Sequence, residues 1–82
     1  MPDIKTDPRR LRWLCRRGMK ELDLLLLRYL DASYPQASED EQLAFEALLD
    51  QDDPVLWAWL SGAQAQPEGM LGELITRLRA YR

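Results

Sequence analysis

Histidine is absent from this 82-residue chain, and cysteine occurs only once. Without histidine, the chain lacks the commonest general base, the commonest metal ligand and every Ser-His or Cys-His catalytic pair. The single cysteine, Cys15, cannot form a disulfide within the chain, and one cysteine without histidine does not make a zinc site. The composition therefore argues against an enzyme, a zinc protein or a disulfide-stabilised domain.

Glycine-rich and long apolar segments are also missing. The four glycines stand apart from one another, and none follows a predicted strand as in a phosphate-binding loop. No apolar run approaches the ~18 residues that a membrane span needs. The first ten residues, MPDIKTDPRR, contain no apolar segment of a secretory signal. We therefore expect a cytoplasmic protein without direct membrane insertion, in which Cys15 stays reduced.

Leucine dominates what is present. Sixteen residues are leucine, whereas valine, isoleucine and threonine together number five. Because β-branched residues are the ones that sheets favour, this imbalance predicts helices. We predict an all-α fold, a compact five-helix bundle with short connections, as a single domain over residues 1–82 with a flexible N-terminus at 1–6.

The first two helices have clear boundaries. Asp7 and Pro8 are typical of an N-cap followed by the first helical position, and Gly18 ends this segment in the left-handed conformation common after helices. The second helix runs from about Met19 to Ser33. Its leucines spread so widely around the axis that we expect this helix to be central and covered on several sides.

Capping residues and glycine also delimit the remaining helices. Ser38 as N-cap and Glu41 three residues later form a capping box for the third helix. A second Asp-Pro pair, at 53–54, starts a short fourth helix that Gly62 ends. The last helix carries apolar residues at helical spacing between 71 and 78.

The cysteine and the tryptophans have to be assigned to the core or the surface. Cys15 shares an apolar face, which favours a buried small hydrophobe over a thiol activated by nearby arginines. Spacing predicts Trp59 in the core and Trp57 on a different side of the same helix. Trp13 lies beside several arginines and is a candidate for a contact with a partner.

Charge is distributed unevenly along the chain. Residues 1–20 carry a net charge of +5, residues 21–53 carry −9, and residues 54–82 carry +1, which sums to −3. Such asymmetry is typical of a surface that meets a charged partner, although solvated faces produce it as well. The acidic middle would repel phosphates, so we expect no nucleic acid as a partner.

Two segments resemble a known family. Residues 13–23, WLCRRGMKELD, resemble the RGxxE signature of the succinate dehydrogenase flavinylation factors (SdhE-like assembly factors), here Arg17, Gly18 and Glu21. Residues 52–60, DDPVLWAWL, resemble the second recurrent stretch of that family, an acidic pair, a proline and a downstream tryptophan-leucine. The resemblance spans about residues 8–61, and the last helix resembles the family only in being a helix.

The resemblance implies a small five-helix bundle that binds the flavoprotein subunit of succinate dehydrogenase, or of the related fumarate reductase. It further implies that this binding promotes covalent attachment of FAD to a histidine of that subunit. Because the chain has no histidine, it cannot carry a histidyl-flavin itself. We therefore expect an assembly chaperone rather than an enzyme, monomeric when alone, with no cofactor of its own and with FAD on the partner.

The residues expected to contact the partner centre on the signature. They are Arg17, Gly18 and Glu21, flanked by Arg10, Trp13 and Met19. A structural interpretation also accounts for part of the motif, since glycine as N-cap with glutamate at the third helical position would form a capping box. It leaves Arg17 unexplained, because a positive charge beside a helix N-terminus is mildly unfavourable.

A second function is compatible with the same sequence. Chains that resemble this family have been assigned an antitoxin-like or regulatory role, with a membrane-associated toxin as partner. The basic front and the acidic middle would suit any charged partner. Co-purification of a flavoprotein would distinguish the first function from this alternative.

Overall fold

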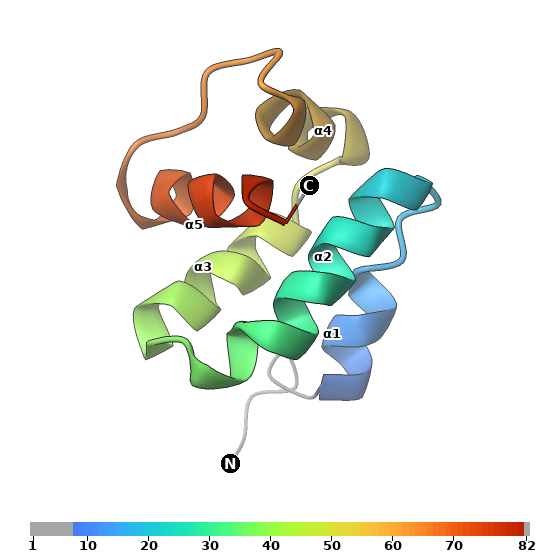
Figure 1. Ribbon diagram of the computed structural model, residues 1–82, viewed down its shortest axis with the longest axis vertical. Helices are drawn as coiled ribbons and strands as arrows, with labels where there is room; N and C mark the ends of the chain where they lie inside the picture. The colour runs from blue at the N-terminus through green and yellow to red at the C-terminus, as the bar shows by residue number, and fades with distance from the viewer. Residues whose placement is uncertain (1–7, 82) are drawn as a thin grey trace.

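Five α-helices and no strand make up residues 8–81, the part of the chain that the computed structural model describes (Figure 1). The helices are α1 (Pro8–Leu14), α2 (Lys20–Ala32), α3 (Glu39–Leu49), α4 (Asp53–Ser61) and α5 (Gly69–Arg79), and the 3-10 turn η2 (Tyr34–Gln36) lies between α2 and α3. The all-α prediction is confirmed. The flexible segment predicted at 1–6 and the cap predicted at Asp7 lie outside the described residues.

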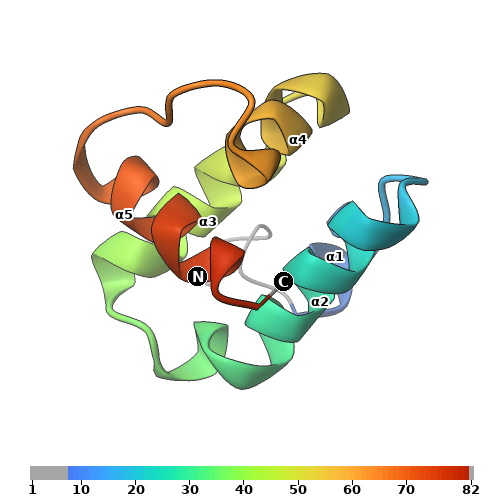
Figure 2. The same cartoon turned by 45° about the horizontal axis from the view of Figure 1, so that its top comes forward.

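The helices pack around α5 and along one antiparallel pair. Helices α1 and α2 lie side by side and run in opposite directions, as both views show (Figures 1 and 2). The last helix, α5, returns across the molecule and contacts α2, α3 and α4. This arrangement leaves the corner between α1 and α2 at the edge of the molecule (Figure 1).

The core consists of apolar residues from all five helices. It contains Leu11, Cys15, Leu22, Leu25, Leu26, Tyr29, Leu30, Tyr34, Phe45, Leu48, Leu49, Leu56, Leu60, Leu74, Ile75 and Leu78. Cys15 is fully buried, which confirms the interpretation as a small hydrophobe. Burial raises the pKa of its thiol from 9.0 to about 12, although Arg17 and Arg12 act in the opposite direction.

Helix α2 is covered on several sides, as predicted, by α1, η2 and α5, while Leu24 on its remaining side is 45% exposed. One prediction about burial was wrong. The two tryptophans of α4 do not divide between core and surface, because Trp57 and Trp59 are both half-buried against the core. Helix α4 is only nine residues long and packs at the edge of the bundle, so neither aromatic ring is fully enclosed.

The capping box predicted for α3 is half correct. The hydroxyl of Ser38 accepts a hydrogen bond from the backbone N–H of Glu41 at 3.1 Å, as predicted. The carboxylate of Glu41 does not return to the cap. It is buried, accepts a hydrogen bond from the Tyr29 hydroxyl at 2.5 Å and pairs with Arg77. A contact among α2, α3 and α5 therefore replaces the local one.

Candidate interaction site at the α1–α2 corner

Gly18 forms the turn between α1 and α2. Its φ angle is +89°, in the region that glycine adopts far more readily than other residues, which confirms the predicted left-handed conformation. The residue is exposed, and a β-carbon at this position would have no heavy atom within 4 Å. The corner therefore presents bare backbone to solvent.

The glycine capping box predicted for α2 is wrong. The N-cap of α2 is Met19, and Glu21 is the second residue of the helix rather than the third. The corner is held instead by Asp23, whose carboxylate oxygens accept hydrogen bonds from the backbone N–H groups of Arg17 at 2.7 Å and Gly18 at 3.3 Å. Asp23 is not among the predicted site residues, although an acidic residue in the first turn of a helix is the signal for such a role.

The guanidinium group of Arg17 is directed into the protein. Its Nε donates to Oδ1 of Asp53 at 2.7 Å, and its Nη1 donates to the carbonyl oxygens of Leu14 and Leu49, both at 2.9 Å. Its Nη2 donates to the carbonyl oxygen of Gln51 at 2.5 Å. Only 13% of the side chain is exposed. Within the described chain all three guanidinium nitrogens are engaged, so the contact of Arg17 with a partner stays a prediction.

Arg17 contacts the ends of three helices at once. It binds carbonyl oxygens at the ends of α1 and α3, where a cation is favoured by the helix dipole. Its ionic partner, Asp53, lies in the first turn of α4, where an anion is favoured. Asp53 is not the N-cap that the Asp-Pro pair predicts, because Asp52 occupies that position, without a side-chain cap bond. The pair of Arg17 and Asp53 joins the two segments that carry the family resemblance.

The other predicted contact residues do not all lie at the corner. Gly18 and Glu21 are exposed at the corner, and Met19 between them is half-buried against the core. Trp13, near the end of α1, is 68% exposed. Arg10 is exposed but lines a separate hollow between α1 and α3. The structure thus brings the signature residues together and leaves Arg10 on another side of α1.

The basic front and the acidic middle of the chain meet within the fold. Arg12 of α1 pairs with Asp31 of α2, and Arg17 pairs with Asp53. Part of the charge asymmetry in the sequence is therefore neutralised internally. The exposed cations of this region that appear in neither pair include Arg10, Arg16 and Lys20.

None of the helices within residues 8–81 is long and apolar enough to cross a membrane.

Comparison with known proteins extends the resemblance beyond the corner. Residues 9–82 match the family described as flavinator of succinate dehydrogenase. The chain is 46% identical over 69 residues to the FAD assembly factor SdhE of Idiomarina loihiensis, covering 84% of this chain and 77% of that protein. It is 45% identical over 71 residues to the FAD assembly factor SdhE of Methylococcus capsulatus, covering 87% of this chain and 86% of that protein.

The FAD assembly factor SdhE of Xylella fastidiosa is 42% identical over 78 residues, or 95% of this chain and 80% of that protein. The family match includes the last helix, which lies beyond the resemblance at residues 8–61. The similarity therefore covers the whole described bundle rather than residues 8–61 alone.

Proposed function

This chain belongs to the family of succinate dehydrogenase flavinators, the FAD assembly factors, and we propose that it binds the flavoprotein subunit of that enzyme through the α1–α2 corner. The observation that carries the proposal is the exposed, side-chain-free backbone of Gly18, whose N–H donates a hydrogen bond to the carboxylate of Asp23. A glycine turn of this kind lets another backbone approach closely. The flavoprotein subunit of fumarate reductase is a second partner that we include in the proposal.

The chemistry of flavin attachment belongs to the partner. This chain has no histidine, so the histidine that becomes bonded to FAD is on the flavoprotein subunit. Holding reacting groups in a near-attack arrangement lowers a barrier by up to about 7–11 kcal/mol. A small bundle with a fixed corner supplies such an arrangement by fixing a mobile part of the flavoprotein. In this mechanism the chain contributes binding and orientation, and no bond-making group.

We further propose that the chain binds no FAD itself, is monomeric when alone and acts in the cytoplasm. The sequence contains no dinucleotide-binding glycine loop. The purified protein is expected to be colourless and to elute as a monomer in size-exclusion chromatography. A stoichiometric yellow chromophore after purification would contradict the assignment of FAD to the partner.

The test of the proposed function is genetic and direct. The gene is deleted, and the large dehydrogenase subunit is examined by in-gel flavin fluorescence. We expect the fluorescence to be lost and to return when the wild-type gene is supplied. Fluorescence that is unchanged by the deletion would contradict the proposal. Co-purification of the flavoprotein subunit with a tagged chain tests the physical contact separately.

A further inference from the structure

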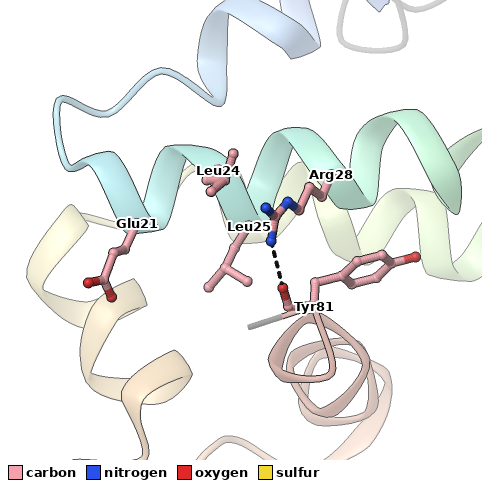
Figure 3. A pocket seen from close by; sticks show the side chains of 5 residues that line it. All are labelled: Glu21, Leu24, Leu25, Arg28 and Tyr81. Atoms are coloured by element: carbon pink, nitrogen blue, oxygen red, sulfur yellow. Dashed lines mark hydrogen bonds between the residues drawn. The ribbon is translucent and has the colours of Figure 1, made fainter.

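The outer face of α2 continues from the corner as an exposed apolar surface. Two hollows meet on it at Leu24. The first is lined by Gly18, Lys20, Asp23, Leu24 and Leu27. The second, of about 320 Å³, is lined by Glu21, Leu24, Leu25, Arg28 and Tyr81 (Figure 3). Leu24 therefore connects the corner with the hollow between α2 and the end of α5.

The second hollow combines an apolar wall with a cation, Arg28, at one end and an anion, Glu21, at the other. Arg28 donates from Nη1 to the carbonyl oxygen of Tyr81 at 3.1 Å, so a protein contact already engages this cation (Figure 3). Glu21 lies at the opposite end, exposed, and no residue within 8–81 forms a hydrogen bond or ion pair with its carboxylate. The hollow is thus apolar along Leu24 and Leu25 and negative at its corner end.

We propose that this hollow receives a segment of the flavoprotein subunit that places one large apolar side chain over Leu24 and Leu25 and a lysine or arginine against Glu21. This inference rests on the proposed function and names the chemistry of the partner at the same surface. Charge complementarity selects the basic residue, because an exposed, unpaired carboxylate beside an apolar wall is matched by a cation. Leu24 lines both this hollow and the one that contains Gly18, so the hollow is continuous with the surface proposed to bind the flavoprotein. The flavoprotein is therefore the expected occupant.

The size of the hollow agrees with this occupant. About 320 Å³ is near the lower limit for sites that enclose a small molecule, which range over about 300–1,000 Å³. An open site of this volume suits a few protein side chains better than a dinucleotide. Interfaces concentrate their binding free energy on a few such central apolar contacts with a polar rim.

Leu43 provides a matched control, because an exposed leucine by itself is ordinary. Leu43 is 52% exposed, close to the 45% of Leu24, but it lies on α3 and lines neither hollow. We expect Leu24→Ser to weaken binding of the purified flavoprotein subunit at least tenfold in isothermal titration calorimetry. Leu43→Ser is expected to change the dissociation constant less than twofold, and both variants are expected to retain wild-type circular dichroism.

The charge at Glu21 is tested by its own pair of variants. Glu21→Gln is expected to weaken binding and to reduce its dependence on salt, and Glu21→Lys to weaken binding further through repulsion of a basic side chain. Tighter binding by Glu21→Lys would contradict the proposal that the partner places a lysine or arginine against Glu21.

The outcomes separate this inference from the proposed function. Wild-type binding by Leu24→Ser together with lost binding by Gly18→Leu would contradict the hollow as a binding site. The α1–α2 corner would remain the interaction site. Wild-type binding by both variants overturns the corner as the interaction site. Lost binding by both, with Leu43→Ser unaffected, is the result expected.

Discussion

The guanidinium of Arg17 and the carboxylate of Asp53 lie 2.7 Å apart from Nε to Oδ1, although 36 positions separate the two residues in the chain. This partly buried pair joins the loop before α2 to the first turn of α4. The same guanidinium also binds three backbone carbonyl oxygens, so its removal leaves several polar groups unsatisfied. Arg17 therefore holds the corner in the position at which Gly18 and Glu21 are exposed.

Arg17→Ala is expected to lower both stability and FAD attachment. Breaking a buried, hydrogen-bonded ion pair costs about 3–5 kcal/mol, and the partial exposure of Asp53 lowers this to about 2–3 kcal/mol. Chemical denaturation measures the free energy of unfolding, and in-gel flavin fluorescence measures the activity. Asp53→Asn should produce the same pattern with a smaller loss, because the carbonyl contacts of Arg17 remain.

Arg12→Ala is the control for this prediction. Arg12 also pairs with an acidic residue, Asp31, but both side chains are at least half exposed, at 50% and 58%. Exposed pairs contribute about 0–1 kcal/mol, so we expect a small change in stability. If Arg17→Ala unfolds at the wild-type denaturant concentration yet fails to bind the flavoprotein, Arg17 acts by direct contact rather than by holding the corner.

Gly18→Leu is expected to remain folded and helical but to fail in FAD attachment. The open space around this position accepts a side chain, so the cost to the monomer is the backbone strain of a positive φ, about 1–2 kcal/mol. The added side chain occupies the surface that the partner is proposed to approach. Circular dichroism checks the fold, and flavin fluorescence of the partner subunit checks the activity.

Gly69 offers a matched control for Gly18. Its φ angle is +80°, and a β-carbon there would also have no heavy atom within 4 Å, but Gly69 lies at the start of α5. Gly69→Leu therefore carries a similar strain and is expected to keep full activity. Full activity of Gly18→Leu as well would make its glycine a purely structural requirement of the turn.

Association with the flavoprotein is expected to weaken as salt is raised from ~0.05 M to ~0.5 M. Exposed charges are screened over roughly 10 Å at 0.1 M salt and over less at higher salt. Lys20→Gln, which removes an exposed cation beside Gly18, is expected to reduce the salt dependence. Arg79→Gln, a change of an exposed arginine on α5, is expected to leave it unchanged. An affinity that is indifferent to salt would exclude the basic front as part of the contact.

Stability is expected to fall above pH 9. Burial raises the pKa of Cys15 from 9.0 to about 12 and that of Tyr29 from 10.0 to about 12. Between these values the unfolded chain loses protons that the folded chain keeps, so the free energy of unfolding decreases as pH rises. The slope is about 1.4 kcal/mol per pH unit for each group.

Urea denaturation at a series of pH values measures this decline, and Cys15→Ala is the control. The variant should show a decline that begins near pH 10, from Tyr29 alone, rather than near pH 9. An unchanged onset in Cys15→Ala would mean that the thiol ionises in the folded protein as readily as in the unfolded chain.

Local sequence signals were sufficient for the helices and for part of the corner. The leucine spacing, the Asp-Pro pair at 53–54, Ser38 and Gly62 predicted helices within a few residues of their observed bounds. The left-handed conformation of Gly18 and the burial of Cys15 were also predicted. Each of these features depends on neighbours within one or two helical turns, which the sequence displays directly.

Only the tertiary structure decided how the charged side chains are used. Arg17 binds Asp53 and Glu41 binds Tyr29 and Arg77, and each of these contacts joins different helices. The exposure of Leu24 likewise depends on which sides of α2 are covered by α1 and α5. A buried charge takes the partner that satisfies it best, and helix packing determines which partner that is, so spacing along the chain could not predict it.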